Sequence, residues 1–129
     1  MKLYVVEPGT DQTRARLETA SLVATSRIAY PEARAALARR QREAGITRSA
    51  LARAVAALDR DLERFVVVEL TGKVARRAGE LAERRALRGF DAIHLASAIE
   101  VEQLTDAMGS FLCFDDRLRH AAAAEGLSV

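Results

Sequence analysis

An α/β fold with a parallel sheet covered by helices on both faces is the fold class that this sequence predicts. Short apolar, β-branched runs alternate along the chain with helical stretches of ten or more residues, which is typical of strand–helix–strand units. Right-handed crossovers of that length join parallel strands. With 129 residues, half of them hydrophobic, the chain is expected to form a single domain over residues 1–129.

The expected elements follow this alternation along the whole chain. The run FVVVEL is the strongest strand signal, because it is short, rich in β-branched residues and followed by the turn residues Thr71 and Gly72. Helices are predicted over residues 11–20, 27–44, 48–65, 73–87, 90–104 and 115–125, and strands over residues 22–25, 65–70 and 110–114.

The second and third of these helices are adjacent and predict a projecting αα-hairpin. Ser26 and Thr47 are suitable N-cap residues for the two helices, and the first helix is expected to end near Gly45. Pro31 lies inside the first helix and predicts a kink or a late start there. The hairpin contains more helix than one crossover needs, which suggests a surface for a partner.

Composition excludes some classes of function. All of the basic residues except Lys2 and Lys73 are arginines, which suit contacts with phosphate or carboxylate, although a composition bias that also raises the alanine content explains them more simply. Cys113 is the only cysteine, so a disulfide framework and a cysteine metal cage are excluded. The sequence has no membrane-length apolar run and no signal-peptide pattern, so a cytoplasmic setting without membrane partners is expected.

Glu32 interrupts an apolar helical face. Its neighbours three and four positions away are Ile28, Ala29, Ala35 and Ala36, so its carboxylate is predicted to turn inward. A buried carboxylate is protonated, paired or bound to a metal. An ion pair with Arg27 or Arg34 is the simplest alternative to a functional role.

Two further acids lie where helices begin. Asp91 opens a helix that is apolar on nearly every side, where it can also offset the helix dipole, and His94 on the same side is expected to be a packed core residue. Asp115 directly follows the predicted strand FLCF and can also cap the next helix. The carboxyl end of a parallel strand is where open sheets place their ligands. Asp116 beside it is expected to face solvent.

Together these acids predict a site for a hard cation. Mg²⁺ or Mn²⁺ prefers oxygen ligands and retains several waters, so Glu32, Asp91 and Asp115 are the candidate ligands, with Asp116 as an additional one. Carboxylate sites for Mg²⁺ commonly serve phosphoryl chemistry, in which the ion activates a water and stabilises charge on the phosphate. The arginines then suggest a nucleic-acid backbone as substrate. Arg117 is the candidate RNA contact, with a surface ion pair as its alternative role.

Three segments resemble the PIN-domain ribonucleases, specifically the VapC toxins of toxin–antitoxin pairs: VATSRIAYPEARAAL, LRGFDAIHLASA and FLCFDDRLRHAAAAEGL. The resemblance implies a parallel-sheet α/β fold, Mg²⁺- or Mn²⁺-dependent RNA cleavage, inhibition by a VapB antitoxin and a homodimer. Its acidic residues correspond to Glu32, Asp91 and Asp115. Cys113 departs from the family pattern, which commonly has a small hydroxyl residue at that position.

The start of the chain departs further from the family. MKLYVVEPGTD resembles the end of the family's first helix, and not the strand before it that ends in an Asp. The single domain is therefore expected to be N-terminally incomplete. A divalent-metal-dependent ribonuclease toxin is the favoured function, and the alternative is a catalytically impaired PIN-like remnant that only binds an antitoxin, through a groove lined by the helices of residues 26–63.

Overall fold

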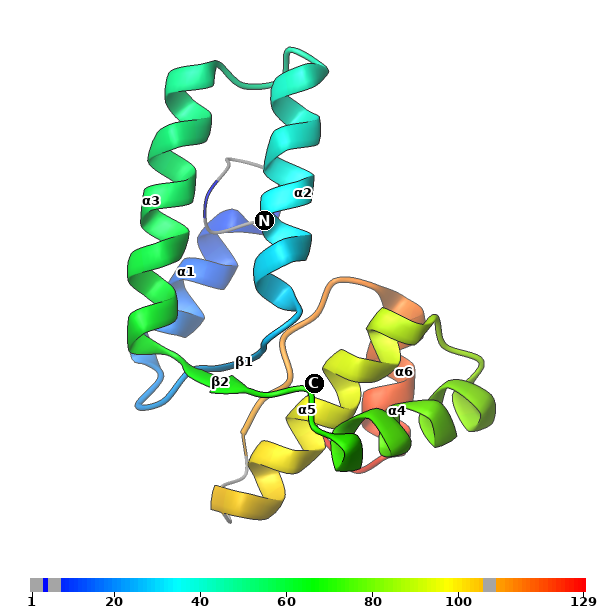
Figure 1. Cartoon of the computed structure of the whole chain (residues 1–129). Coiled ribbons are helices and arrows are strands. Elements are labelled where there is room, and N and C mark those ends of the chain that lie inside the picture. Colours follow the sequence, from blue (N-terminus) through cyan, green and yellow to red (C-terminus); the bar gives the residue numbers. More distant parts are fainter. Residues whose placement is uncertain (1–3, 5–7, 106–108) are drawn as a thin grey trace. The chain divides into compact units, whose positions relative to one another are not determined.

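A computed structural model describes residue 4 and residues 8–105 and 109–129 of the chain. Its elements, in chain order, are α1 (Thr10–Thr19), β1 (Ala24–Ser26), α2 (Ala29–Arg42), α3 (Arg48–Arg64), β2 (Val66–Val68), α4 (Gly72–Arg85), α5 (Gly89–Thr105) and α6 (Asp116–Ala124) (Figure 1). They form two compact units, one of Met1–Val23 with Ala29–Val66 and the other of Ala24–Ile28 with Val67–Val129.

The two strands form a small parallel sheet, which confirms the predicted α/β class. The Val66 N–H donates to the Val23 carbonyl, and the Arg27 N–H donates to the Val68 carbonyl, both at 2.9 Å. These bonds pair β1 with β2 in parallel register. The strands are shorter than predicted: β1 begins two residues later than the run LVAT, and β2 leaves out the exposed Glu69 and Leu70.

The prediction of a strand over residues 110–114 is wrong. The structure shows one isolated parallel bridge there, between Ser110 and Ser128, with the Phe111 N–H donating to the Ser128 carbonyl at 2.7 Å. Phe111 and Cys113 instead pack their side chains against the hydrophobic core of the second unit. The apolar character of the run therefore serves side-chain packing and not a backbone ladder.

In the first unit, α2 and α3 pack against each other as the predicted αα-hairpin. The Thr47 side chain accepts from the Ala50 N–H at 3.0 Å, so the predicted cap of α3 is confirmed. The prediction of Ser26 as the cap of α2 is wrong, because Ser26 belongs to β1. Helix α2 begins late, at Ala29, as Pro31 predicted.

The end of α2 is set by an alanine and not by the predicted glycine. Ala44 adopts the left-handed conformation, with φ of 56°, and the Gly45 N–H donates to the Arg40 carbonyl at 2.8 Å. Helix α4 ends in the same way, with Ala86 at φ of 51° and the Leu87 N–H bonded to the Ala82 carbonyl. Such a bond satisfies one of the free carbonyls of the last helical turn.

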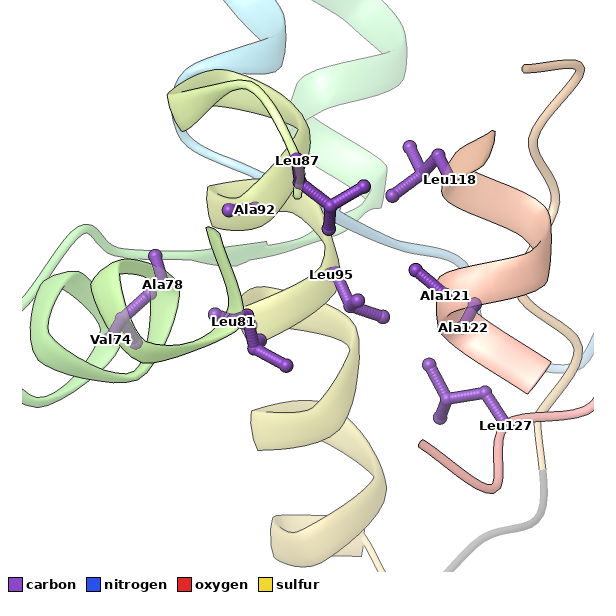
Figure 2. Close-up of a cluster of buried hydrophobic side chains, with 11 residues drawn as sticks. Val74, Ala78, Leu81, Leu87, Ala92, Leu95, Leu118, Ala121, Ala122 and Leu127 are labelled. Atoms are coloured by element: carbon purple, nitrogen blue, oxygen red, sulfur yellow. The ribbon is translucent and has the colours of Figure 1, made fainter. Parts of the chain in front are cut away.

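Helix α5 is the central element of the second unit, because it packs against α4, α6 and β1. Figure 2 shows the hydrophobic cluster that these contacts bury, with side chains of α4 and α6 directed toward α5. Ala92, Leu95 and Ala96 are completely buried. Gly89, predicted to break the preceding helix, is the first residue of α5, so the break lies just before it.

Two largely buried carboxylates form ion pairs with basic residues of α4. Glu100 of α5 accepts from Lys73 at 2.8 Å and from Arg77 at 3.4 Å, both on α4. Glu125, which follows α6, pairs with Arg84 and Arg85 of α4, and the hydrogen bond from Arg85 is the main reason that its pKa is lowered. Across the described ranges, no helix is both long and apolar enough to cross a membrane.

If α5 is the centre of the core, Leu95→Ala should lower the free energy of unfolding by about 2–5 kcal/mol, because it leaves a cavity among packed side chains. Urea unfolding followed by circular dichroism measures this change. Leu104→Ala is the control on the same helix, since Leu104 is 75 % exposed, and it should change stability by less than about 0.5 kcal/mol. Equal losses in the two variants would contradict the packing described.

Candidate active site

Asp91 is positioned by the buried helix α5. It lies in the first turn, where free backbone N–H groups and the helix dipole favour a carboxylate, and it is half-buried. The burial of Ala92 directly after it fixes the helix face that the turn presents. Among the described residues no hydrogen bond or ion pair to the Asp91 side chain is found, so no guanidinium neutralises it there.

Asp115 caps α6, which confirms one of the two roles predicted for it. Its Oδ1 accepts from the Leu118 N–H at 2.8 Å, and its backbone is extended, as an N-cap residue requires. The buried Leu118 side chain fixes this turn against the core. Asp116 points to solvent, as expected, with its side chain 78 % exposed and paired with Arg119 at 2.9 Å.

Cys113 links the two acids. Its thiol donates to the Asp115 carbonyl at 3.4 Å. Burial is the main cause that raises the pKa of the Cys113 thiol, the hydrogen bond to Asp115 opposes it, and the charges of Asp115 and Asp91 raise the pKa further. The charges of both carboxylates thus act on the same thiol, and a shared site of Asp91 and Asp115 stays a prediction. The thiol stays protonated at neutral pH and adds no negative charge to this place.

Glu32 lies in the first turn of α2 and is half-buried, in agreement with the predicted inward face. It belongs to the first compact unit, whereas Asp91 and Asp115 belong to the second. Its place beside the two aspartates stays a prediction. Arg27 pairs with Glu69, and Arg34 donates to the Tyr30 hydroxyl at 2.6 Å.

Asp91 and Asp115 suit a magnesium or manganese ion by their chemistry. No group of three or more His, Cys, Asp or Glu side chains that could hold a metal occurs within the ranges that the structure describes. Mg²⁺, however, is commonly held by one or two carboxylates together with water and substrate oxygens. The pair Asp91 and Asp115 supplies such a donor set, and neither acid has an arginine partner among these residues.

Ser26 is a polar group that the sequence did not identify as part of a site. It lies at the carboxyl end of β1, the strand that packs against α5, and is 3 % exposed. Its hydroxyl is buried without a hydrogen-bond partner in the described part of the chain. Such a group is normally satisfied by an ordered water or ion. Its position next to a predicted helix favoured a capping role, and no local pattern predicted a buried hydroxyl without a partner.

Arg117, the predicted RNA contact, is exposed in the first turns of α6. No ion-pair partner of Arg117 is found among residues 8–105 and 109–129 of the structure. Contact with RNA stays a prediction for this residue.

Comparison with known proteins identifies the family. A model of the PIN domain matches residues 3–124. The chain belongs to the PIN-domain family. Two proteins of Mycobacterium tuberculosis, Ribonuclease VapC45 of strain CDC 1551 / Oshkosh and Ribonuclease VapC49 of strain ATCC 25618 / H37Rv, are each 41% identical to it over 133 residues, covering 100% of this chain and 88% of the relative.

A third relative, Ribonuclease VapC46 of strain ATCC 25618 / H37Rv, is 35% identical over 129 residues, again covering 100% of this chain and 88% of its own. The family match spans both compact units of this PIN domain, including Glu32, Asp91 and Asp115. The predicted resemblance to VapC-type toxins is thereby confirmed.

The two roles of Asp115 in this PIN domain can be separated by substitution. Asp115→Ala should lower the free energy of unfolding by about 0.5–2 kcal/mol, because the Leu118 N–H loses its acceptor. Asp115→Ser keeps a capping oxygen without the carboxylate and should stay close to the wild type. Thermal and urea unfolding compare the three proteins, and equal destabilisation of both variants would show that the cap contributes little.

Proposed function

We propose that this PIN-domain protein is a divalent-metal-dependent ribonuclease toxin that hydrolyses RNA phosphodiester bonds. The observation that carries the proposal is the match of residues 3–124 to the PIN domain. Asp91 and Asp115, which lie where α5 and α6 begin and have no arginine partner among the described residues, support it. The three relatives are all named as ribonucleases, which supports the same activity and favours it over a remnant that only binds a partner.

In the proposed mechanism Asp91 and Asp115 hold the ion, with Glu32 as a third ligand and Asp116 as an additional one. A bound Mg²⁺ or Mn²⁺ supplies electrostatic stabilisation of the charge that develops on the phosphate, and activates water. The Leu118 N–H donates to Oδ1 of Asp115 and so holds the carboxylate in one orientation. Its other oxygen, Oδ2, would be available to the ion. Cys113, as a neutral thiol, leaves the negative charge of the two aspartates available to the cation.

An antitoxin of the VapB type is the proposed inhibitor. An open hollow of about 300 Å³ lies between α2 and α3, in the first unit. Ala38, Leu51, Ala52 and Val55 form its apolar part, and Arg34 and Arg48 flank it. These residues suit the apolar side chains of a helical segment that also carries acids. A homodimer and a cytoplasmic location complete the proposal.

RNA cleavage with Mg²⁺, with and without chelator, tests the proposed function. Asp91→Asn and Asp115→Ser should each lower the cleavage rate by at least about 100-fold, because each removes a negative ligand or its support. Asp115→Ser is the sharper variant, since it is expected to retain the helix cap.

Asp116→Asn is the matched control, because it removes a neighbouring carboxylate that faces solvent and pairs with Arg119. It should retain most of the activity. Cleavage that persists in chelator, or that is unchanged in Asp91→Asn, would contradict the proposed function. A loss of activity in Asp116→Asn as large as that in Asp115→Ser would mean that Asp116 is also essential for cleavage.

A further inference from the structure

The end of the αα-hairpin carries an unusual concentration of positive charge. Residues 34–53 include six basic side chains, all arginines, and a single acid, Glu43. We call these six the hairpin arginines; they are Arg34, Arg39, Arg40, Arg42, Arg48 and Arg53. They belong to the last two turns or so of α2 and the first two of α3, on either side of the connecting loop.

The geometry of the hairpin gathers these arginines. Since an α-helix rises about 1.5 Å per residue, all six lie within about 12 Å of the loop along the helix axes. Glu43 reports their proximity: the hydrogen bond from Arg39 is the main cause that lowers its pKa, and the charges of Arg42 and Arg40 lower it further. Three arginines thus act on one carboxylate, and positive charge is in excess.

The internal contacts of the hairpin arginines are weak ones. The Arg39–Glu43 pair, at 2.8 Å, has side chains 72 % and 59 % exposed, and such exposed pairs contribute about 0–1 kcal/mol. Arg53 donates only to the Ser49 hydroxyl, at 2.8 Å. Arg42 and Arg48 are exposed. These guanidinium groups can therefore exchange their present contacts for an external anion at little cost.

Outside the apolar hollow that Arg34 and Arg48 flank, the surroundings of the remaining hairpin arginines favour a phosphate backbone over a protein surface. None of the large hydrophobic side chains that are exposed in the described residues lies within residues 34–53. Protein interfaces depend on buried aromatic and aliphatic anchors, whereas contacts with a nucleic-acid backbone depend on charge alone. Arginine offers the bidentate geometry that phosphate oxygens accept.

We propose that the hairpin arginines bind the phosphate backbone of RNA, as a second contact area besides the acids that carry out cleavage. This inference rests on the proposed function in that RNA is the substrate. It deepens that function by adding a contact to the substrate backbone besides the acids.

The test is RNA binding in chelator, where no cleavage occurs. The patch variant carries Arg39→Gln, Arg42→Gln and Arg53→Gln, and avoids the two arginines that flank the hollow between α2 and α3. Fluorescence anisotropy with a labelled RNA stem–loop over a series of salt concentrations should show an affinity at least about tenfold lower, and a salt slope smaller by about 2, because three phosphate contacts are lost.

The control variant carries Arg60→Gln, Arg64→Gln and Arg76→Gln, three exposed arginines outside residues 34–53. It loses the same net charge and should bind the stem–loop within about threefold of the wild type. A lysine variant, with Arg39→Lys, Arg42→Lys and Arg53→Lys, keeps the charge and should recover most of the affinity. Circular dichroism melting checks that each variant folds. If the triple glutamine variant does not fold, the single variants Arg42→Gln and Arg53→Gln carry the test, and each should lower the affinity by a smaller factor than the triple variant.

Equal losses in the patch and control variants would overturn the inference, because bulk charge would then explain the binding. Unchanged affinity in the patch variant would overturn it as well. So would a patch variant that no longer binds an acidic peptide but binds the RNA as tightly as the wild type. Cleavage of a trinucleotide in Mg²⁺ separates the two proposals. If the wild type cleaves no RNA but the patch effect on affinity remains, the proposed function fails and the hairpin contact stands.

Discussion

The complete burial of one face of helix α5 is the constraint on which the second unit depends. Ala92, Leu95 and Ala96 have no exposed surface, and α4, α6 and β1 all pack against this one helix. A helix held on three sides has little freedom to rotate or shift. Its first turn therefore presents Asp91 in a fixed direction, and α6, packed on the same core, presents Asp115. The core of small and aliphatic side chains thus fixes the two helix starts that carry these carboxylates.

The helices of this protein could be predicted from the sequence because their signals are local. Thr47 caps α3 as expected, and the periodic apolar positions locate α4 to α6 within a few residues. The strands were less predictable. Residues 110–114 have the composition of a strand, yet whether such a run forms a ladder depends on a neighbouring backbone, which no local pattern records. The left-handed conformation of Ala44 and Ala86 could not be predicted either, because glycine is the residue expected at such positions.

Only part of the candidate site could be predicted from the sequence. The acids could be selected from the sequence because each interrupts an apolar pattern or starts a helix, and the charges of Asp91 and Asp115 act on one thiol. The cap made by Asp115 and the ion pair of Asp116 also followed from local rules. The buried hydroxyl of Ser26 could not be found, because burial without a partner depends on the packing of β1 against α5. Glu32 lies in the other compact unit, and the roles of Glu32, Asp91 and Asp115 as metal ligands stay predictions.

The most direct measurement of the central claim is a titration with Mn²⁺ alone, followed by amide NMR. A paramagnetic ion held by the predicted acids should broaden the signals of Asp91, Cys113, Asp115 and Glu32 at low ion concentration, and the broadening should disappear in Asp91→Asn. Signals around Glu43, on the hairpin, should stay sharp. Broadening confined to other acids, or no selective broadening at all, would contradict the claim that α5 and α6 position a divalent metal site.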